Sequence, residues 1–205
     1  IKKGFAGIYG HNGCGVIIKN CNFKYGVDIH VDGNCTLDNV KLTAYFRQMI
    51  SANNLILKDV NIELIKVSGS EIHISFGAKD KIDVIDSIIG TENKKSKISF
   101  EAKNEINVIN SKICGKKIEC DSKRINADEK SSLIATDKVT LKTDNFTPIN
   151  ITAPTIVLNE EEISIEKKSI LLEKVTDSLT LKRLELVNTL KKIKKECERI
   201  SQKKL

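Results

Sequence analysis

The chain has 205 residues, a formal net charge of +7 and a hydrophobic content of 40%, which is enough to bury a core. No apolar run approaches the ~18 residues that a membrane-spanning helix needs, so the sequence excludes such a helix. Aromatic residues make up only 4% and Trp is absent. Ile, Val and Leu carry most of the apolar mass, which favours a narrow interior of stacked strands over a globular core.

The cysteine and histidine patterns argue against a disulfide scaffold and against a metal site. Six cysteines in this length are too few and too unevenly spaced for a disulfide framework. The sequence has no C-x-x-C pair and only three scattered histidines, so we predict no metal and no cofactor. We interpret the cysteines as free thiols, which favours the cytoplasm or another reducing compartment. The first residue is Ile1 rather than Met, and we expect the chain to be a piece of a longer protein.

Glycine is concentrated near the N-terminus, where residues 4–15 hold five of the eleven glycines. Their spacing matches no phosphate-binding pattern, and no Gly-Lys-Ser/Thr follows them. We therefore expect tight corners in a first structural turn rather than a nucleotide-binding loop.

From residue 18 onward a six-residue signature returns: apolar, polar, Asn or Asp, small or apolar, polar, apolar. Successive copies are 19, 20, 27 and 24 residues apart. Their central residues are Asn20, Asn39, Asp59, Asp86 and Asn110. Looser copies are centred on Thr143 and Glu160. The step of 33 residues before Thr143 is too long for one turn, so we expect a degenerate turn around residues 125–127.

The most regular part of the chain is a repeat with a period of 24 residues. Residues 74–89 return as residues 98–113, with ten of the sixteen positions identical. Three of the six differences replace Asp80, Asp83 and Asp86 by Asn, which keeps the shape of the side chain and removes its charge. A match of this length at one period indicates stacked structural repeats.

Steps of about 20 residues predict a parallel β-helix, in which each circuit adds short strands stacked roughly 4.8 Å above the last. The Asn or Asp at a fixed corner tolerates a left-handed backbone, and its side chain can hydrogen-bond the next copy as a ladder. We therefore predict an all-β solenoid of about eight turns over residues 1–175, most regular between residues 15 and 115.

The signature, with Asn20, Asn39, Asp59, Asp86 and Asn110 in the ladder position, resembles the right-handed parallel β-helix family, the pectate-lyase-like solenoids. The resemblance implies a right-handed coil over about residues 4–165. It leaves the function open, because this family includes lyases, hydrolases, tailspikes, adhesins and structural rods. It also implies that the polar insertions at residues 63–70 and 90–97 wall a cleft. The alternative is that solenoids simply tolerate surface insertions.

From about residue 176 the period of the apolar residues becomes helical. They recur at heptad spacing at Leu186, Leu190, Ile193, Cys197 and Ile200. Residues 176–205 hold nine Lys or Arg and four Asp or Glu, a net charge of +5. We predict a basic amphipathic α-helix that caps the solenoid or forms a short coiled coil, through which the chain self-associates or binds a protein partner. Its lysine-rich face is either solvated or binds an acidic partner, and the lack of interleaved aromatics disfavours nucleic acid.

Alternation along the strands predicts one outward face with binding chemistry. Its residues are Asp28, His30, Tyr45, Arg47, His73, Ser75 and Glu101. Such a face could bind a sugar, with a histidine as base. Against catalysis, Asp28 and Glu101 would lie about three turns or ~14 Å apart, beyond the ~5–9.5 Å between the carboxylates of glycoside hydrolases.

The sequence therefore favours a non-enzymatic structural or interaction rod that belongs to a larger protein or assembly. The alternative is a carbohydrate-active or glycan-binding β-helix of the lyase, hydrolase or tailspike kind, which would use the outward face. No catalytic residue is assigned, and the ladder residues are interpreted as structural.

Overall fold

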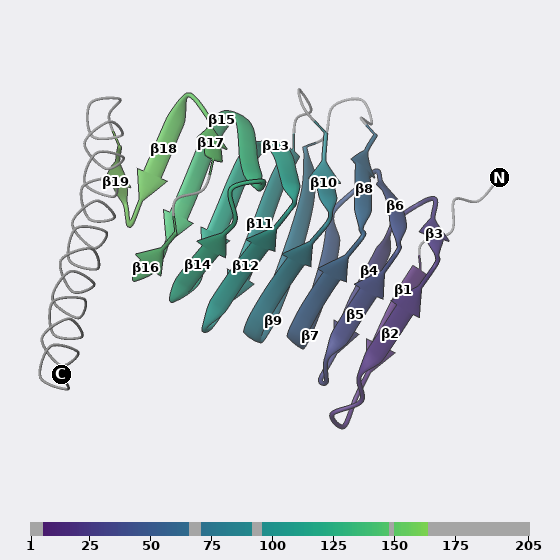
Figure 1. Ribbon diagram of the computed structural model, residues 1–205. Helices are drawn as coiled ribbons and strands as arrows, with labels where there is room; N and C mark the ends of the chain where they lie inside the picture. The colour runs from purple at the N-terminus through teal and green to yellow at the C-terminus, as the bar shows by residue number, and fades with distance from the viewer. Residues whose placement is uncertain (1–5, 66–70, 92–95, 148–149, 164–205) are drawn as a thin grey trace, which may run out of the picture. The chain divides into compact units, whose positions relative to one another are not determined.

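The computed structural model describes residues 6–65, 71–91, 96–147 and 150–163, which fold into a parallel β-solenoid of about seven turns. All nineteen described strands belong to one continuous sheet that winds around an apolar interior. Strands of successive turns lie side by side, from β1 near the N-terminus to β19 (Figure 1). The predicted fold class, an all-β parallel solenoid, is confirmed.

Three columns of parallel strands form the walls of the solenoid. Column A begins with β1 (Ala6–Gly10) and β4 (Val27–Val31) and also contains β11 (Ser96–Ala102) and β18 (Thr155–Leu158). Column B contains β2 (Val16–Lys19), β5 (Cys35–Asp38), β12 (Glu105–Ile109), β14 (Arg124–Ala127) and β16 (Asn145–Phe146). Column C contains β3 (Asn22–Phe23), β6 (Lys41–Ala44), β8 (Asn61–Leu64), β10 (Ile88–Gly90) and β17 (Asn150–Thr152).

Four long strands each belong to two columns. The strands β7 (Gln48–Lys58) and β9 (Ile72–Ile85) pair first in column A and then in column B. The strands β13 (Lys112–Asp121) and β15 (Ser132–Lys142) pair first in column C and then in column A. Each turn therefore visits column A, then B, then C.

The lengths of the turns explain the uneven spacing of the signature. In column C the partners in register are Leu42, Ile62, Ile89, Ile113 and Leu133, which gives steps of 20, 27, 24 and 20 residues. The two longer turns carry their extra residues between columns C and A, after β8 and after β10. The insertions at 63–70 and 90–97 therefore both begin where a column C strand ends.

The later part of the chain departs from the predicted repeat. The degenerate turn expected around residues 125–127 exists as β14 in column B. The late copies of the signature were assigned to the wrong corner, because Thr143 and Glu160 follow column A strands whereas Asn110 follows a column B strand. An apolar–polar pattern does not distinguish one strand end from another. β19 (Glu161–Glu162) pairs antiparallel with β18, so the described parallel stack has about seven turns where about eight were predicted.

The corner between columns B and C carries the predicted ladder. All five residues adopt positive φ, between 45° and 54°: Asn20, Asn39, Asp59, Asp86 and Asn110. Asn39 Nδ2 donates to Asn20 Oδ1 at 2.6 Å, and Asn110 Nδ2 donates to Asp86 Oδ1 at the same distance. Ionised Asp59 and Asp86 offer only hydrogen-bond acceptors, so the two acids cannot bond to each other. The amide of Asn110 supplies the donor that the carboxylate of Asp86 needs.

A second ladder lies just inside this corner and was not predicted. Ser87, Ser111 and Ser131 follow the corner on successive turns and are buried. Each hydroxyl oxygen accepts from a backbone N–H of the preceding turn, at 3.0 Å from Val60, 3.0 Å from Ser87 and 3.2 Å from Ser111. The hydroxyls of Ser87 and Ser111 also donate to the carbonyl two residues earlier at 2.7 Å. These bonds satisfy buried N–H groups where strand pairing is interrupted.

The interior is filled mainly by Ile, Val and Leu, as the composition predicts. Phe76 and Phe100 stack on successive turns with ring centroids 4.8 Å apart and 12° between the ring planes. Gln48 is also fully buried, where its Oε1 accepts from Val27 N at 2.6 Å and its Nε2 donates to the preceding carbonyl at 3.0 Å. Gly26, at φ 93°, makes room for this amide, because a Cβ there would lie 2.5 Å from it.

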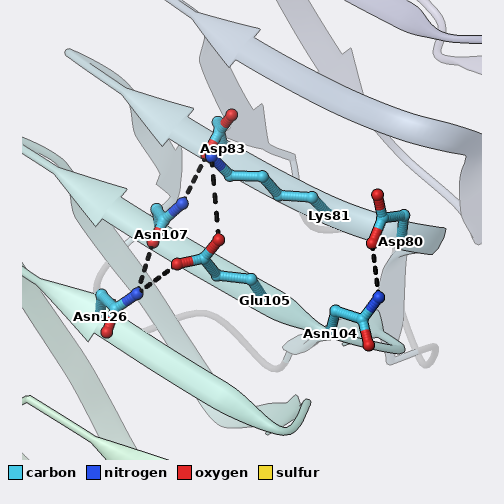
Figure 2. A network of polar contacts seen from close by, with 7 residues as sticks. All are labelled: Asp80, Lys81, Asp83, Asn104, Glu105, Asn107 and Asn126. Atoms are coloured by element: carbon cyan, nitrogen blue, oxygen red, sulfur yellow. Dashed lines mark hydrogen bonds and ion pairs between the residues drawn. The ribbon is translucent and has the colours of Figure 1, made fainter.

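Paired polar side chains cover the outer face of column B (Figure 2). Lys81 Nζ lies 3.1 Å from Asp83 Oδ1 and 3.9 Å from Glu105 Oε2. Asn107 Nδ2 donates to Asp83 Oδ1 at 2.7 Å. Asn126 Nδ2 lies 2.8 Å from Asn107 Oδ1 and 2.7 Å from Glu105 Oε1, and donates to both. Charges of opposite sign and amides thus alternate along this face.

The three Asp-to-Asn differences of the 24-residue repeat create donor–acceptor pairs between turns. Asn104 Nδ2 donates to Asp80 Oδ1 at 2.6 Å, as Figure 2 shows. Asn107 pairs with Asp83 in the same way, and the third pair is the ladder pair at Asn110. Repeating the acid instead would place like charges directly opposite each other, which is destabilising.

The chain divides into two compact units, Ile1–Glu162 and Ile163–Leu205. The predicted basic helix, its heptad positions and the predicted boundary at residue 175 lie outside the described residues. None of the described residues forms a helix long and apolar enough to cross a membrane.

Candidate functional site

The residues predicted to form a binding face lie along one wall of the solenoid, on or beside the outside of column A. Alternation places Ile29 and Phe76 in the core and turns their neighbours outward. The outward residues named from the sequence on these strands are Asp28, His30, His73, Ser75 and Glu101. Arg47 directly precedes β7, and Tyr45 lies in the connection from column C, where it stacks on Tyr25 with ring centroids 6.0 Å apart.

The strand register arranges this face into three rows that run along the stack. The cationic row contains Arg47, His73, Lys97, Lys117 and Lys138. The hydroxyl row contains Asp28, Met49, Ser75, Ser99, Glu119 and Thr140. The groove row contains Tyr9, His30, Ser51, Gly77, Glu101, Asp121 and Lys142. Arg47 and Asp28 each directly precede a residue that is paired in register. The predicted residues are therefore divided among rows instead of converging on one point.

Four residues of the groove row line an open groove of about 350 Å³: His30, Ser51, Gly77 and Glu101. Ser51 and Gly77 lie between His30 and Glu101 in the row, so small side chains occupy the middle of the groove. His30 Nδ1 lies 2.8 Å from Ser51 Oγ, and Tyr9 stacks on the imidazole with ring centroids 5.8 Å apart. The groove thus brings together two of the predicted residues, His30 and Glu101.

Asp28, His73 and Ser75 are instead engaged with neighbouring turns. The carboxylate of Asp28 accepts a hydrogen bond from Met49 N at 2.7 Å. His73 Nε2 lies 3.2 Å from Ser99 Oγ, whose hydroxyl donates to Ser75 Oγ at 3.2 Å. These contacts run parallel to the solenoid axis and join successive turns.

A second acid beside Glu101 was missed from the sequence. Asp121 on β13 is its partner in register on the next turn, so two exposed carboxylates occupy adjacent turns. Both line a further open groove together with Lys103, Lys123 and Lys142. The long step before Thr143 hid this strand, whose alternation of Ile118 and Cys120 was the available signal.

Burial and neighbouring charges both act on the pKa of His73 in the cationic row. The pKa of His73 is lowered chiefly by burial and then by the positive charges of Lys97 and Arg47. Glu119 and Glu71 act in the opposite direction and more weakly. Lys97 Nζ forms an ion pair with Glu119 Oε2 at 2.7 Å. The lowered pKa favours the neutral imidazole, which lies between Arg47 and Lys97 in the row.

The five described cysteines are thiols that form no disulfide bond, as predicted, and none of them belongs to the three rows of this face. Cys14 and Cys21 are exposed, whereas Cys35, Cys114 and Cys120 are buried. Burial raises the pKa of Cys35 to about 11 and that of Cys120 to about 12, so neither is a thiolate at neutral pH. Among the described residues no three His, Cys, Asp or Glu side chains are grouped so that they could hold a metal ion.

These features define a parallel β-solenoid with stacked side-chain ladders and a polar outer face on column A. Comparisons of the chain with protein-family models, with curated proteins and with solved structures found no match. The architecture is consistent with a β-helix fold.

Proposed function

We propose that this chain is a structural or interaction rod without catalytic activity and that it forms part of a larger protein or assembly. The observation that supports this proposal best is that polar side chains form hydrogen bonds between successive turns. Amides, hydroxyls and carboxylates on the corner and on the walls bond to the equivalent side chain one turn away, and buried serine hydroxyls accept from backbone N–H groups of the preceding turn. Such pairing stabilises a repetitive scaffold, because each turn contacts only its neighbours.

We propose a right-handed coil, since crossovers between parallel strands are nearly always right-handed. The basic segment at residues 176–205 would form an amphipathic helix that caps the strand edges at the end of the solenoid or associates with a second copy. Free thiols favour a reducing compartment for the assembly.

Sedimentation velocity and thermal unfolding of the whole chain and of a chain that ends at residue 175 would test the role of the tail. If the tail is a cap or a coiled coil, its removal lowers the unfolding temperature or changes the oligomeric state. Two forms that are equally stable and equally monomeric would rule out both roles.

A glycan-binding or carbohydrate-active function is the second candidate, and the groove on column A favours it. A row of small residues between His30 and Glu101, with the exposed ring of Tyr9 stacked on His30, offers hydrogen-bonding groups beside an aromatic surface. A glycan array and a screen for lyase and hydrolase activity on polyuronates would test it. If these assays detect neither binding nor cleavage, this candidate is rejected and the structural role remains.

A further inference from the structure

The cationic row has a different charge pattern from the outer face of column B. On column B, Lys81 is followed in register by Glu105, and each repeated acid faces an amide. The cationic row instead places Arg, His, Lys, Lys and Lys on five successive turns, roughly 4.8 Å apart, with no acid in the row. Like charges directly opposite each other on neighbouring strands repel, as Lys97, Lys117 and Lys138 do in this row.

Counter-ions within the protein relieve only part of this charge. Lys97 pairs with Glu119. Arg47, Lys117 and Lys138 form no ion pair with any residue in the part of the chain that the structure describes. Arg47 is exposed, so its guanidinium is free to reach a ligand that lies over the neighbouring turn.

We propose that Arg47, His73 and Lys97 form a binding site for a phosphate or sulfate group. They occupy consecutive turns of one row, and the hydroxyls of Ser75 and Ser99 lie beside them in the adjacent row. A guanidinium binds a tetrahedral oxyanion through two parallel N–H bonds, and an ammonium adds a compact charge. The contact of His73 Nε2 with Ser99 Oγ, at 3.2 Å, orients the ring and leaves its other nitrogen for the ligand.

Binding at this site is coupled to a proton. In the free protein the pKa of His73 is held low by burial, Lys97 and Arg47, against the weaker opposing effects of Glu119 and Glu71. A bound dianion favours the imidazolium, so it raises this pKa and takes up a proton. Affinity should therefore increase as the pH falls through the pKa of His73 in the complex toward its pKa in the free protein.

Isothermal titration with inorganic sulfate is the direct test, because sulfate stays a dianion over the whole range from about pH 5.5 to about pH 8. We expect tighter binding at the lower pH, with proton uptake that shows as a dependence of the heat on the buffer. Arg47→Gln should weaken binding about ten-fold or more, and His73→Gln should remove the proton uptake and the pH dependence. Because Arg47 is exposed, its variant should keep the unfolding temperature of the unmodified chain, which checks the fold.

Lys138→Gln is the matched control, because it removes one cation from the same row three turns away from His73. It should change the affinity for sulfate less than two-fold. A linear polyphosphate is the second probe. If Lys138→Gln weakens the binding of polyphosphate and leaves that of sulfate unchanged, the natural group is carried on a polymer that lies along the row. If the variant and the unmodified chain bind polyphosphate with equal affinity, the natural ligand is a free anion. The proposal is overturned if sulfate does not bind at either pH, if Arg47→Gln and Lys138→Gln lose the same affinity, or if His73→Gln leaves the pH dependence intact.

Discussion

Replacing Asn110 by Asp tests why the repeat exchanges acids for amides. Asn110 Nδ2 donates to Asp86 Oδ1 at 2.6 Å, and Asn110 N donates to both carboxylate oxygens of Asp128 at 3.0 Å. Asn110→Asp removes one hydrogen bond, at ~1 kcal/mol, and places a new charge between two existing carboxylates. Each pair of unit charges at ~4 Å repels by ~1 kcal/mol in water and more in a lower dielectric. Since these side chains are exposed, we expect a loss of ~2–3 kcal/mol in the free energy of unfolding at neutral pH and low salt.

Urea denaturation at several pH values measures this loss directly. The repulsion requires ionised carboxylates, so the difference between variant and unmodified chain should shrink as the pH falls below the carboxylate pKa values, and also as salt is added. Asn20→Asp is the matched control at the same kind of corner. There Asn39 donates to residue 20, so an Asp keeps the acceptor and meets no acid on the next turn. Equal effects at the two corners, or a loss at Asn110 that persists unchanged in acid, would refute the reasoning.

Three further substitutions follow from the packing and the charges. Gly26→Ala should lower the free energy of unfolding, measured by urea denaturation, by ~2 kcal/mol or more, because φ is 93° and the new Cβ would clash with a buried amide. Gly77→Ala is the control: the nearest atom to its new Cβ is 3.8 Å away, so its loss should stay within ~1 kcal/mol. Similar losses for the two variants would contradict this prediction. Phe100→Ala should destabilise by ~3–5 kcal/mol, since the ring is 1% exposed and stacked, and a loss below ~1 kcal/mol would show that the interior collapses around the gap. The pKa of Asp128 is lowered, first by the Ser131 hydroxyl, so its stabilisation is present above its unfolded pKa and is lost as the pH falls through its folded pKa. Asp128→Asn should therefore flatten the acid side of the stability profile, and an unchanged acid limb would argue against that role.

The sequence by itself determined the corner ladder and the alternation of the strands. The ladder was predictable because a left-handed corner favours Asn or Asp at one position of every turn, which leaves a period visible in the chain. The inward residues of columns A and B were predictable for a similar reason, since side chains alternate along a strand regardless of its partners. The Asp-to-Asn exchanges were predicted to keep the shape of the side chain and remove its charge, and the structure adds the donor that each amide supplies.

Only the tertiary structure decided which residues of different turns face each other. That register depends on how many residues each corner consumes, and alternation carries no information about this number. For this reason Thr143 was assigned to the wrong corner and Asp121 was not recognised beside Glu101. The buried serines were missed because a small polar residue after a corner has no period of its own until the turns are aligned. The cationic row, likewise, consists of residues that are 20 or more positions apart in the chain and become neighbours only when the turns stack.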